Sequence, residues 1–295
     1  MLSGPRALEK KGKDALLYRI NCILSFKVVG PILIFVKKRH KKKFGKPTRI
    51  NIGGGRFFNK RWGNMDFISS DYPIDDGIVD FNFDLTSGKP FPFESNSIDL
   101  FYSAHCIEHI PNEHLPHIFS EIHRCLKPTG GVRLSAPDLE IIYRRYITER
   151  KSEPKYSRAA QDWFFQSVAT ALVGKIPIDE FHQNVSSMSP KDLAEFYCSQ
   201  LSREFQKENT GHHINWWNYD KLERMLKDAG FQDVRRSRVF ESQFPEMRKK
   251  ATFLGLEKFV RLDKICNLQN MLWFDSKAEE IKGVPDISVY AEAVK

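Results

Sequence analysis

The sequence predicts an α/β fold with a mostly parallel sheet, and three observations support this prediction. The chain has 295 residues, of which 41% are hydrophobic, so it can bury the core of one large domain or of two small ones. From Thr48 onward, short apolar runs alternate with segments of helical periodicity, as in a parallel sheet whose strands are joined by helices. Glycines follow the first run and acidic residues end three later ones, at the edge where open parallel sheets bind ligands.

Four predicted strands come before the first clear helix. They are residues 49–53, 65–71, 79–85 and 97–105. The first runs into the loop Gly53-Gly54-Gly55, the second ends at Asp71, and the third ends at Asp84. Because the carboxyl ends of parallel strands meet at one edge of a sheet, we expect the loop and the two carboxylates to face one crevice.

An amphipathic helix and a fifth strand follow. Asn112 is a suitable N-cap, and apolar residues recur at helical spacing until Pro128 and two glycines end the pattern. The apolar residues are Leu115, Ile118, Phe119, Ile122 and Leu126. The fifth predicted strand, residues 131–138, ends at Asp138.

The remaining sequence is less regular. Residues 139–210 are helical and aromatic-rich without strand alternation, which predicts a helical insertion. A helix that stops at Gly230 and a sixth strand come next, and residues 241–284 form a second insertion. The final stretch "DISVYAEAVK" alternates like a closing strand.

Charge separates an N-terminal arm, residues 1–47, from a domain predicted over residues 48–295. Residues 1–49 hold 14 Lys and Arg against 2 Asp and Glu, whereas the rest holds 32 basic and 35 acidic residues. A body this close to neutral disfavours nucleic acid as a partner, because phosphate binding requires basic charge. Residues 20–36 are apolar but shorter than the ~20 residues that span a bilayer comfortably, and no signal-peptide cleavage site follows them. The arm is either a helix packed on the body, or an interfacial segment at residues 20–46 on an anionic membrane surface.

Several kinds of site are not indicated. The five cysteines are scattered without a C-x-x-C pair, which disfavours a disulfide framework and a zinc site. This usage fits a reducing, cytoplasmic compartment. The arm is a candidate for peripheral attachment to the inner membrane face. No H-E-x-x-H motif is present, so no metal site is predicted. The glycine loop lacks the G-x-x-x-x-G-K-[ST] pattern, and Phe58 stands where a dinucleotide loop needs its third glycine. We expect its ligand to lack a pyrophosphate.

A set of stretches resembles class I S-adenosylmethionine-dependent methyltransferases of the type 11-like kind. Among these, the small methyltransferases associated with cell-surface glycan synthesis are the most similar subgroup. The stretches are "INIGGG", "DLTSGKPFPFESNSIDLFYSAHCIEHI", "EIHRCLKPTGGVRLSAPDLE", "LERMLKDAGF" and "SVYAEAVK". They cover roughly residues 48–145 and 212–295. The resemblance implies a Rossmann-like methyltransferase fold, with a seven-stranded sheet whose last strand is antiparallel, and S-adenosylmethionine as the cofactor.

The resemblance also implies cofactor-binding residues. Gly53, Gly54 and Gly55 would let the backbone approach the methionine part of the cofactor. Asp71 would accept hydrogen bonds from both ribose hydroxyls, with Asp66 as the alternative if the second strand ends earlier. The remaining implied contacts are Asp84 and the Leu85 backbone at the adenine, and Ser103 and His105 near the sulfonium. Asn51 and Phe57 depart from the family pattern, which has an acid and a glycine there.

Methyl transfer to an oxygen also benefits from a general base. The candidates are His105, Asp138, His212 and His213. We interpret Glu108 and His109 as fixing the turn after the fourth strand by hydrogen bonding. Trp216 and Trp217 are candidates for stacking on a sugar face, and the insertion at residues 139–210 is a candidate lid over the acceptor.

The predicted function is therefore methyl transfer, with a small molecule or a glycan as acceptor. The favoured reaction is O-methylation of a sugar hydroxyl on a glycan or glycolipid. An RNA methyltransferase or another small-molecule methyltransferase is the first alternative, and a non-catalytic binding module on the same fold is the second. The oligomeric state is not indicated by the sequence.

Overall fold

The structure is a computed structural model of the 295-residue chain. It describes residues 35, 38–39, 45–55, 61–68, 79–149, 154–201, 211–238, 241–248 and 287–295. The predicted N-terminal arm lies almost wholly outside the described residues, as does most of the second predicted insertion. In the part of the chain that the structure describes, no helix is both long and apolar enough to cross a membrane.

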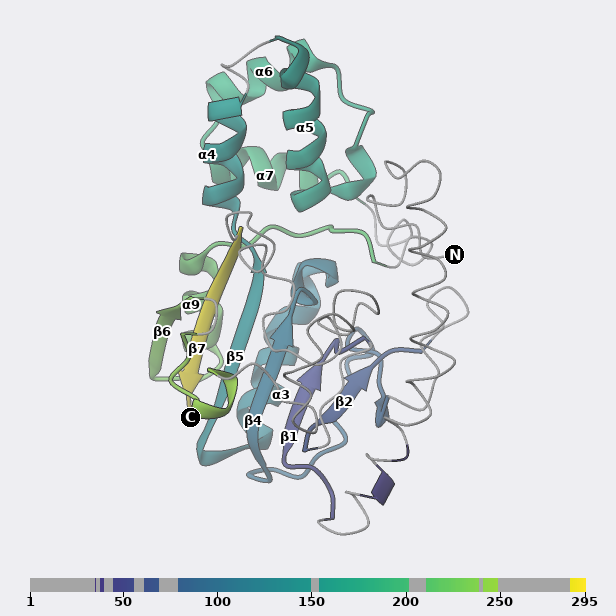
Figure 1. Ribbon diagram of the computed structural model, residues 1–295, viewed down its shortest axis with the longest axis vertical. Helices are drawn as coiled ribbons and strands as arrows, with labels where there is room; N and C mark the ends of the chain where they lie inside the picture. The colour runs from purple at the N-terminus through teal and green to yellow at the C-terminus, as the bar shows by residue number, and fades with distance from the viewer. Residues whose placement is uncertain are drawn as a thin grey trace, which may run out of the picture.

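Seven strands form one sheet in the order β3-β2-β1-β4-β5-β7-β6 (Figure 1). They are β1 Arg49–Ile52, β2 Gly63–Asp66, β3 Phe81–Asn82, β4 Ile98–Ala104, β5 Leu126–Pro137, β6 Asp233–Ser237 and β7 Ser288–Val294. Strand β7 is antiparallel to both of its neighbours, and the other paired strands are parallel. The predicted fold class, a mostly parallel sheet with an antiparallel last strand, is confirmed.

Helices cover the sheet and extend beyond it. They are α3 Leu115–Cys125, α4 Leu139–Glu149, α5 Pro154–Val168, α6 Ile178–Ser187, α7 Pro190–Cys198 and α9 Tyr219–Asp228, with the short 3-10 helices η3 Ile107–His109, η4 Asn112–His114, η5 Thr170–Leu172 and η6 Pro245–Met247. Phe119 of α3, Leu222 of α9 and Phe101 of β4 are buried in one shared core. On the other face of β4, Leu100 and Tyr102 pack in a separate small cluster, so this central strand is covered on both faces.

Helices α4 to α7 form a helical module with its own hydrophobic core. Buried aromatic side chains, among them Tyr146, Phe164 and Phe181, pack at its centre. Figure 1 shows the module beyond the carboxyl ends of the parallel strands, directly after β5. The predicted helical character of residues 139–210 is confirmed over the described residues 139–149 and 154–201. The module is thus placed on the ligand-binding side of the sheet.

The predicted end of the second strand is wrong, and its pairing explains why. Strand β2 aligns with the four-residue strand β1 from Gly63 to Met65, and it ends at Asp66. The Asp66 carboxylate accepts hydrogen bonds from the backbone N–H groups of Gly55 (2.6 Å) and Phe67 (2.7 Å), and so closes the strand. The local sequence "GNMD" has little strand propensity, so its strand conformation depends on β1.

Three other elements begin or end at residues that differ from the prediction. Strand β3 has only two residues, because Asp84 turns the chain by accepting bonds from the N–H and hydroxyl of Thr86 (2.8 Å each). Asn112 does not cap α3, which begins at Leu115; its side-chain oxygen accepts a bond from Lys221 Nζ (3.1 Å). Strand β5 begins at Leu126, five residues earlier than predicted, because Leu126 pairs with Ile98 of β4.

Candidate active site

The glycine loop leaves β1 at the centre of the carboxyl edge. Gly53 has φ 62° and Gly55 has φ 52°, both in the left-handed region that glycine adopts at low cost. A Cβ atom on Gly53 would lie 2.3 Å from Cys106 Sγ, so the loop passes against the segment after β4 with no room for a side chain. The N–H of Gly55 is held by Asp66 (2.6 Å). The sequence thus fixes both the turn of this loop and its close approach to β4.

The predicted cofactor acids are not equally placed. Asp66 stands at the end of β2, next to the glycine loop. Asp71 lies outside the described residues. Asp84 follows β3, and its Oδ1 accepts two hydrogen bonds from Thr86. The neighbouring Leu85 is partly buried and packs on the main core.

Strand β4 brings Ser103 and His105 to the same edge. Ser103 is buried, and its hydroxyl donates to the Ile52 carbonyl of β1 (3.1 Å), so it holds the two strands together beneath the glycine loop. His105 has φ 52°, which is uncommon outside glycine and marks functional sites when the surroundings impose it. Its ring bridges Glu108 Oε1 (3.1 Å from Nδ1) and the Ser288 hydroxyl of β7 (3.0 Å from Nε2).

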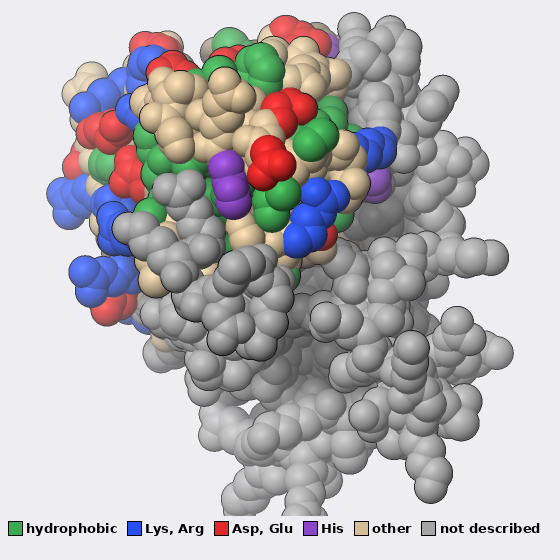
Figure 2. All heavy atoms as spheres, turned by 90° about the horizontal axis from the view of Figure 1, so that it is seen from above, with side chains coloured by type: hydrophobic (Ala, Val, Ile, Leu, Met, Phe, Trp, Pro, Cys, Tyr) green, Lys and Arg blue, Asp and Glu red, His purple; other side chains and the backbone are tan. Residues whose placement is uncertain are grey.

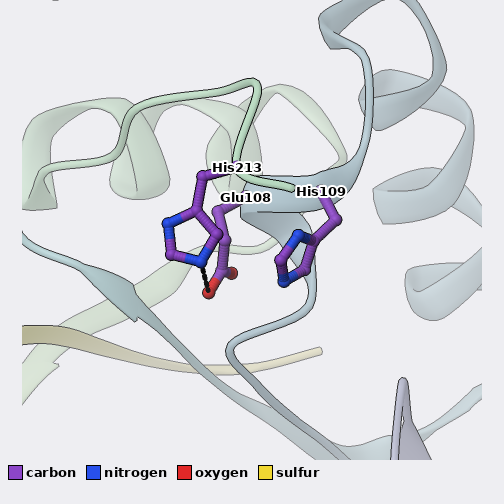
Figure 3. Close-up of side chains that lie close together, drawn as sticks. All are labelled: Glu108, His109 and His213. Carbon is purple, nitrogen blue, oxygen red and sulfur yellow. Dashed lines mark ion pairs between the residues drawn. The ribbon is translucent and has the colours of Figure 1, made fainter. Parts of the chain in front are cut away.

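Glu108, which the sequence interpretation assigned to fixing a turn, is the centre of a side-chain cluster. Its side chain is fully buried, and His213 Nε2 lies 3.8 Å from its Oε1 (Figure 3). The rings of His109 and His213 meet edge to face, with centroids 4.8 Å apart. His109 Nδ1 bonds the His212 carbonyl (3.0 Å), so this side chain ties the turn after β4 to the segment that carries His213. In the sequence, the signals were the pair Glu108-His109 after β4 and the pair His212-His213. Only folding brings these two pairs together.

Backbone contacts fix the segment that carries His213. The N–H of Ile214 donates to the Glu108 carbonyl (3.0 Å), and the N–H of Thr170 in the helical module donates to the His213 carbonyl (3.0 Å). The His213 ring bonds the Ser167 carbonyl of α5 through Nδ1 (2.9 Å). The cluster therefore lies where the end of β4, the helical module and residues 211–217 meet.

Burial and charge set the protonation of this cluster. Burial alone would raise the pKa of the Glu108 carboxyl, but the contact with His105 and the neighbouring imidazoles hold that pKa well below its usual range. Burial, reinforced by the His109 charge, lowers the pKa of His213 to about 4. Burial also lowers the pKa of His212, together with the charge of Lys175. At neutral pH the cluster combines an ionised carboxylate with a neutral His213.

Two residues that were predicted to act on the methyl acceptor instead make contacts within the protein. Asp138 is fully buried; its Oδ1 accepts from the Glu140 N–H at the start of α4 (2.9 Å), and its Oδ2 pairs with Arg236 of β6 (3.2 Å). Burial raises the pKa of this carboxyl. The prediction that both tryptophans could stack on a sugar is wrong for Trp217, which is 1% exposed and packs on Phe119.

The fold has the architecture of a class I methyltransferase, and sequence comparison agrees. A family model described as "Methyltransferase domain" matches residues 6–236. The chain therefore belongs to this methyltransferase family, and it is an S-adenosylmethionine-dependent enzyme. No curated protein matched the chain.

The solved structures that the chain resembles have low sequence identity to it and low TM-scores. A SAM-dependent methyltransferase from Archaeoglobus fulgidus has 16% identity and a TM-score of 0.38, with 94% of this chain and 100% of that one covered. Phosphoethanolamine N-methyltransferase 2 from Haemonchus contortus has 18% identity and a TM-score of 0.35, with 88% of this chain and 52% of that one covered. A methyltransferase from Mesorhizobium loti has 15% identity and a TM-score of 0.36, with 84% and 90% covered. These similarities carry no argument about the acceptor.

The residues at the carboxyl edge fit S-adenosylmethionine. The glycine loop brings backbone without side chains beside β4, and the Asp66 carboxylate lies at the end of the next strand. Its oxygens accept the Gly55 and Phe67 N–H groups, and an ionised carboxylate has more acceptor positions than these two bonds use. Carboxylates are well suited to accept hydrogen bonds from a pair of sugar hydroxyls. When bound, the cofactor supplies an activated methyl group on its sulfonium.

We expect Asp66, rather than Asp71, to contact the ribose, because β2 ends there. In calorimetric titrations with S-adenosylhomocysteine, Asp66→Ala should weaken binding more than tenfold, a change of about 1.4 kcal/mol. With the 2′,3′-dideoxy form of the ligand, the same substitution should cost much less, since the hydroxyls it contacted are gone. The matched variant is Asp71→Ala. If Asp71→Ala alone shows this dependence on the ribose hydroxyls, the assignment to Asp66 is wrong.

Proposed function

We propose that the protein transfers the methyl group of S-adenosylmethionine to a hydroxyl oxygen, with a sugar hydroxyl of a glycan or glycolipid as the favoured acceptor. The observation that carries the proposal is the buried Glu108 carboxylate with three imidazoles around it, just beyond the end of β4. A neutral amine already presents a lone pair to an activated methyl group. A hydroxyl is a weaker nucleophile and benefits from groups that stabilise loss of its proton. The choice of a sugar rests on the sequence resemblance.

The chain's own residues have separate roles in this proposal. The glycine loop and Asp66 hold the cofactor, and Ser103 keeps β1 and β4 aligned beneath it. His105 positions the Glu108 carboxylate from a strained backbone. His213 faces the carboxylate from the segment tied to the helical module, so acceptor binding under the module would bring a hydroxyl to this cluster. Excluding water and aligning the nucleophile with the sulfonium supply the rest of the rate enhancement.

Charge contacts on β6 weigh against the alternative of an RNA acceptor. Arg235 pairs with Asp233 (2.7 Å) and Arg236 pairs with Asp138 (3.2 Å), so two of the arginines in this basic stretch are neutralised. Figure 2 shows acidic and basic side chains interspersed on the face seen from above the module. A surface for nucleic acid would instead gather basic charge.

For residues 20–46, which lie almost wholly outside the described residues, we keep the proposal of contact with an anionic membrane surface. It rests on composition. Equal pelleting with anionic liposomes, with and without residues 1–46, would contradict it.

The function is tested with methyl-labelled S-adenosylmethionine and pairs of acceptors that differ in one group, such as glucose and glucosamine and glycolipids built from them. We expect label in hydroxyl-bearing acceptors as base-stable methyl ethers. His213→Ala should lower kcat by ~10²–10⁴-fold and leave S-adenosylhomocysteine affinity within a few-fold. His117→Ala is the matched control, since its ring bonds the Lys89 carbonyl away from the cluster. Transfer only to amines, or cofactor binding without transfer to any hydroxyl, contradicts the proposal.

A further inference from the structure

The histidine and glutamate side chains around Glu108 have the composition of a metal site. Glu108, His109 and His213 each offer one ligand atom, and these atoms lie within 4.8 Å of one another (Figure 3). Two imidazoles and one carboxylate are a donor set that catalytic zinc sites use, with a fourth position left open. In a tetrahedral zinc site with bonds of about 2.0–2.1 Å, ligand atoms are roughly 3.3 Å apart. The 3.8 Å between His213 Nε2 and Glu108 Oε1 is close to this spacing.

Hydrogen bonds to the backbone already orient both imidazoles as metal ligands are oriented. The Nδ1 of His109 bonds the His212 carbonyl (3.0 Å), and the Nδ1 of His213 bonds the Ser167 carbonyl (2.9 Å). A carbonyl can only accept, so each ring carries its proton on Nδ1 and Nε2 is the nitrogen that can ligate. Metal-bound histidines show this arrangement, because the bond at the far nitrogen fixes the tautomer and the ring orientation.

The carboxylate supplies a second, independent observation. Glu108 is fully buried, and among the described residues neither of its oxygens has a well-aligned hydrogen bond. His105 Nδ1 lies 3.1 Å from Oε1 as an ion-pair contact. A buried carboxylate without hydrogen bonds is costly unless a cation is beside it.

We propose that Glu108, His109 and His213 bind one divalent transition-metal ion, zinc or another imidazole-binding metal, through the carboxylate and two ring nitrogens. His105 and its partner Ser288 (3.0 Å) position the carboxylate from β7. Imidazole and carboxylate donors together suit zinc, iron, nickel and copper better than magnesium or calcium. The site joins the end of β4 to the segment tied to the helical module, so the ion would hold the module at the carboxyl edge of the sheet. Its use in methyl transfer rests on the proposed function; its existence does not.

The test measures metal binding to the full chain without cofactor or acceptor. The protein is treated with a chelator, dialysed, and titrated with Zn²⁺ by calorimetry and with Co²⁺ by visible absorption. We expect one ion per chain, with Co²⁺ bands of low coordination number. Glu108→Gln and His213→Asn should each weaken binding by at least about 100-fold, whereas His117→Ala should leave it unchanged. Zn²⁺ should raise the midpoint of thermal unfolding of the wild type but not of these two variants.

The alternative outcomes are distinct. Absence of stoichiometric binding, or binding that both substitutions leave unchanged, overturns the inference. If Glu108→Gln does not fold, as judged by circular dichroism, His109→Gln replaces it, because the His109 side chain is only partly buried. Metal binding without methylation of any acceptor leaves this inference standing and removes the proposed function. Full methyl transfer by a protein that binds no metal leaves the proposed function standing and overturns this inference.

Discussion

Replacing Gly53 by alanine should weaken S-adenosylhomocysteine binding by at least about 100-fold, or about 2.7 kcal/mol. Gly53 has φ 62°, and its added Cβ would lie 2.3 Å from Cys106 Sγ and 2.5 Å from Cys106 Cβ. The left-handed conformation costs a residue with a side chain roughly 1–2 kcal/mol, and the overlap forces the loop or the segment after β4 to move. Either movement displaces the backbone that faces the cofactor. Calorimetric titration measures the loss.

Two further variants separate strain from overlap. Gly88→Ala introduces a side chain at φ 67° on an exposed turn with nothing within 4 Å, so it should leave ligand affinity nearly unchanged. Adding Cys106→Gly to Gly53→Ala removes the overlapping atoms and should recover part of the affinity. If Gly88→Ala weakens binding as much as Gly53→Ala, or if the double variant recovers nothing, the steric explanation is wrong.

Breaking the ion pair between Arg133 and Glu292 should cost about 3–5 kcal/mol of unfolding free energy. Arg133 on β5 is 0% exposed and Glu292 on β7 is 2% exposed, with Nη1 and Oε1 2.6 Å apart. Glu292 also accepts hydrogen bonds from the Ser242 hydroxyl and from the Gln243 N–H (2.8 Å). Glu292→Leu leaves a buried guanidinium without its counter-charge and frees the segment that passes over the sheet. Denaturant unfolding, read as a shift of the midpoint at constant slope, checks the loss.

The double variant Arg133→Met with Glu292→Leu tests the cause. Apolar side chains of similar volume can replace a buried ion pair at little or no net cost, because the desolvation penalty of both charges also disappears. We therefore expect the double variant to be clearly more stable than Glu292→Leu alone. A double variant as unstable as the single one would show that the lost hydrogen bonds to residues 242–243, and not the unpaired charge, dominate.

The sequence by itself determined the class of the fold, and it predicted the edge of the sheet at which we expect ligands to bind. The alternation of apolar runs and helical segments predicted the parallel sheet, since buried strands and amphipathic helices carry their burial pattern locally. The glycine loop was readable because only glycine adopts φ 62° beside a neighbouring segment without strain. The aromatic-rich stretch after Asp138 was readable as a helical insertion for the same local reason.

Only the tertiary structure decided the features that depend on contacts between distant residues. Strand β2 ends at Asp66 because pairing with β1 sets its length and the Asp66 carboxylate closes it on Gly55. The sequence suggested that Asp138 and Trp217 could contact the acceptor. In the structure Asp138 pairs with Arg236, and Trp217 is buried in the core. Glu108 and His213 carry no joint signal in the sequence, because they lie on different segments. Folding places the His213 ring nitrogen 3.8 Å from a buried carboxylate, and no local pattern encodes such a long-range contact.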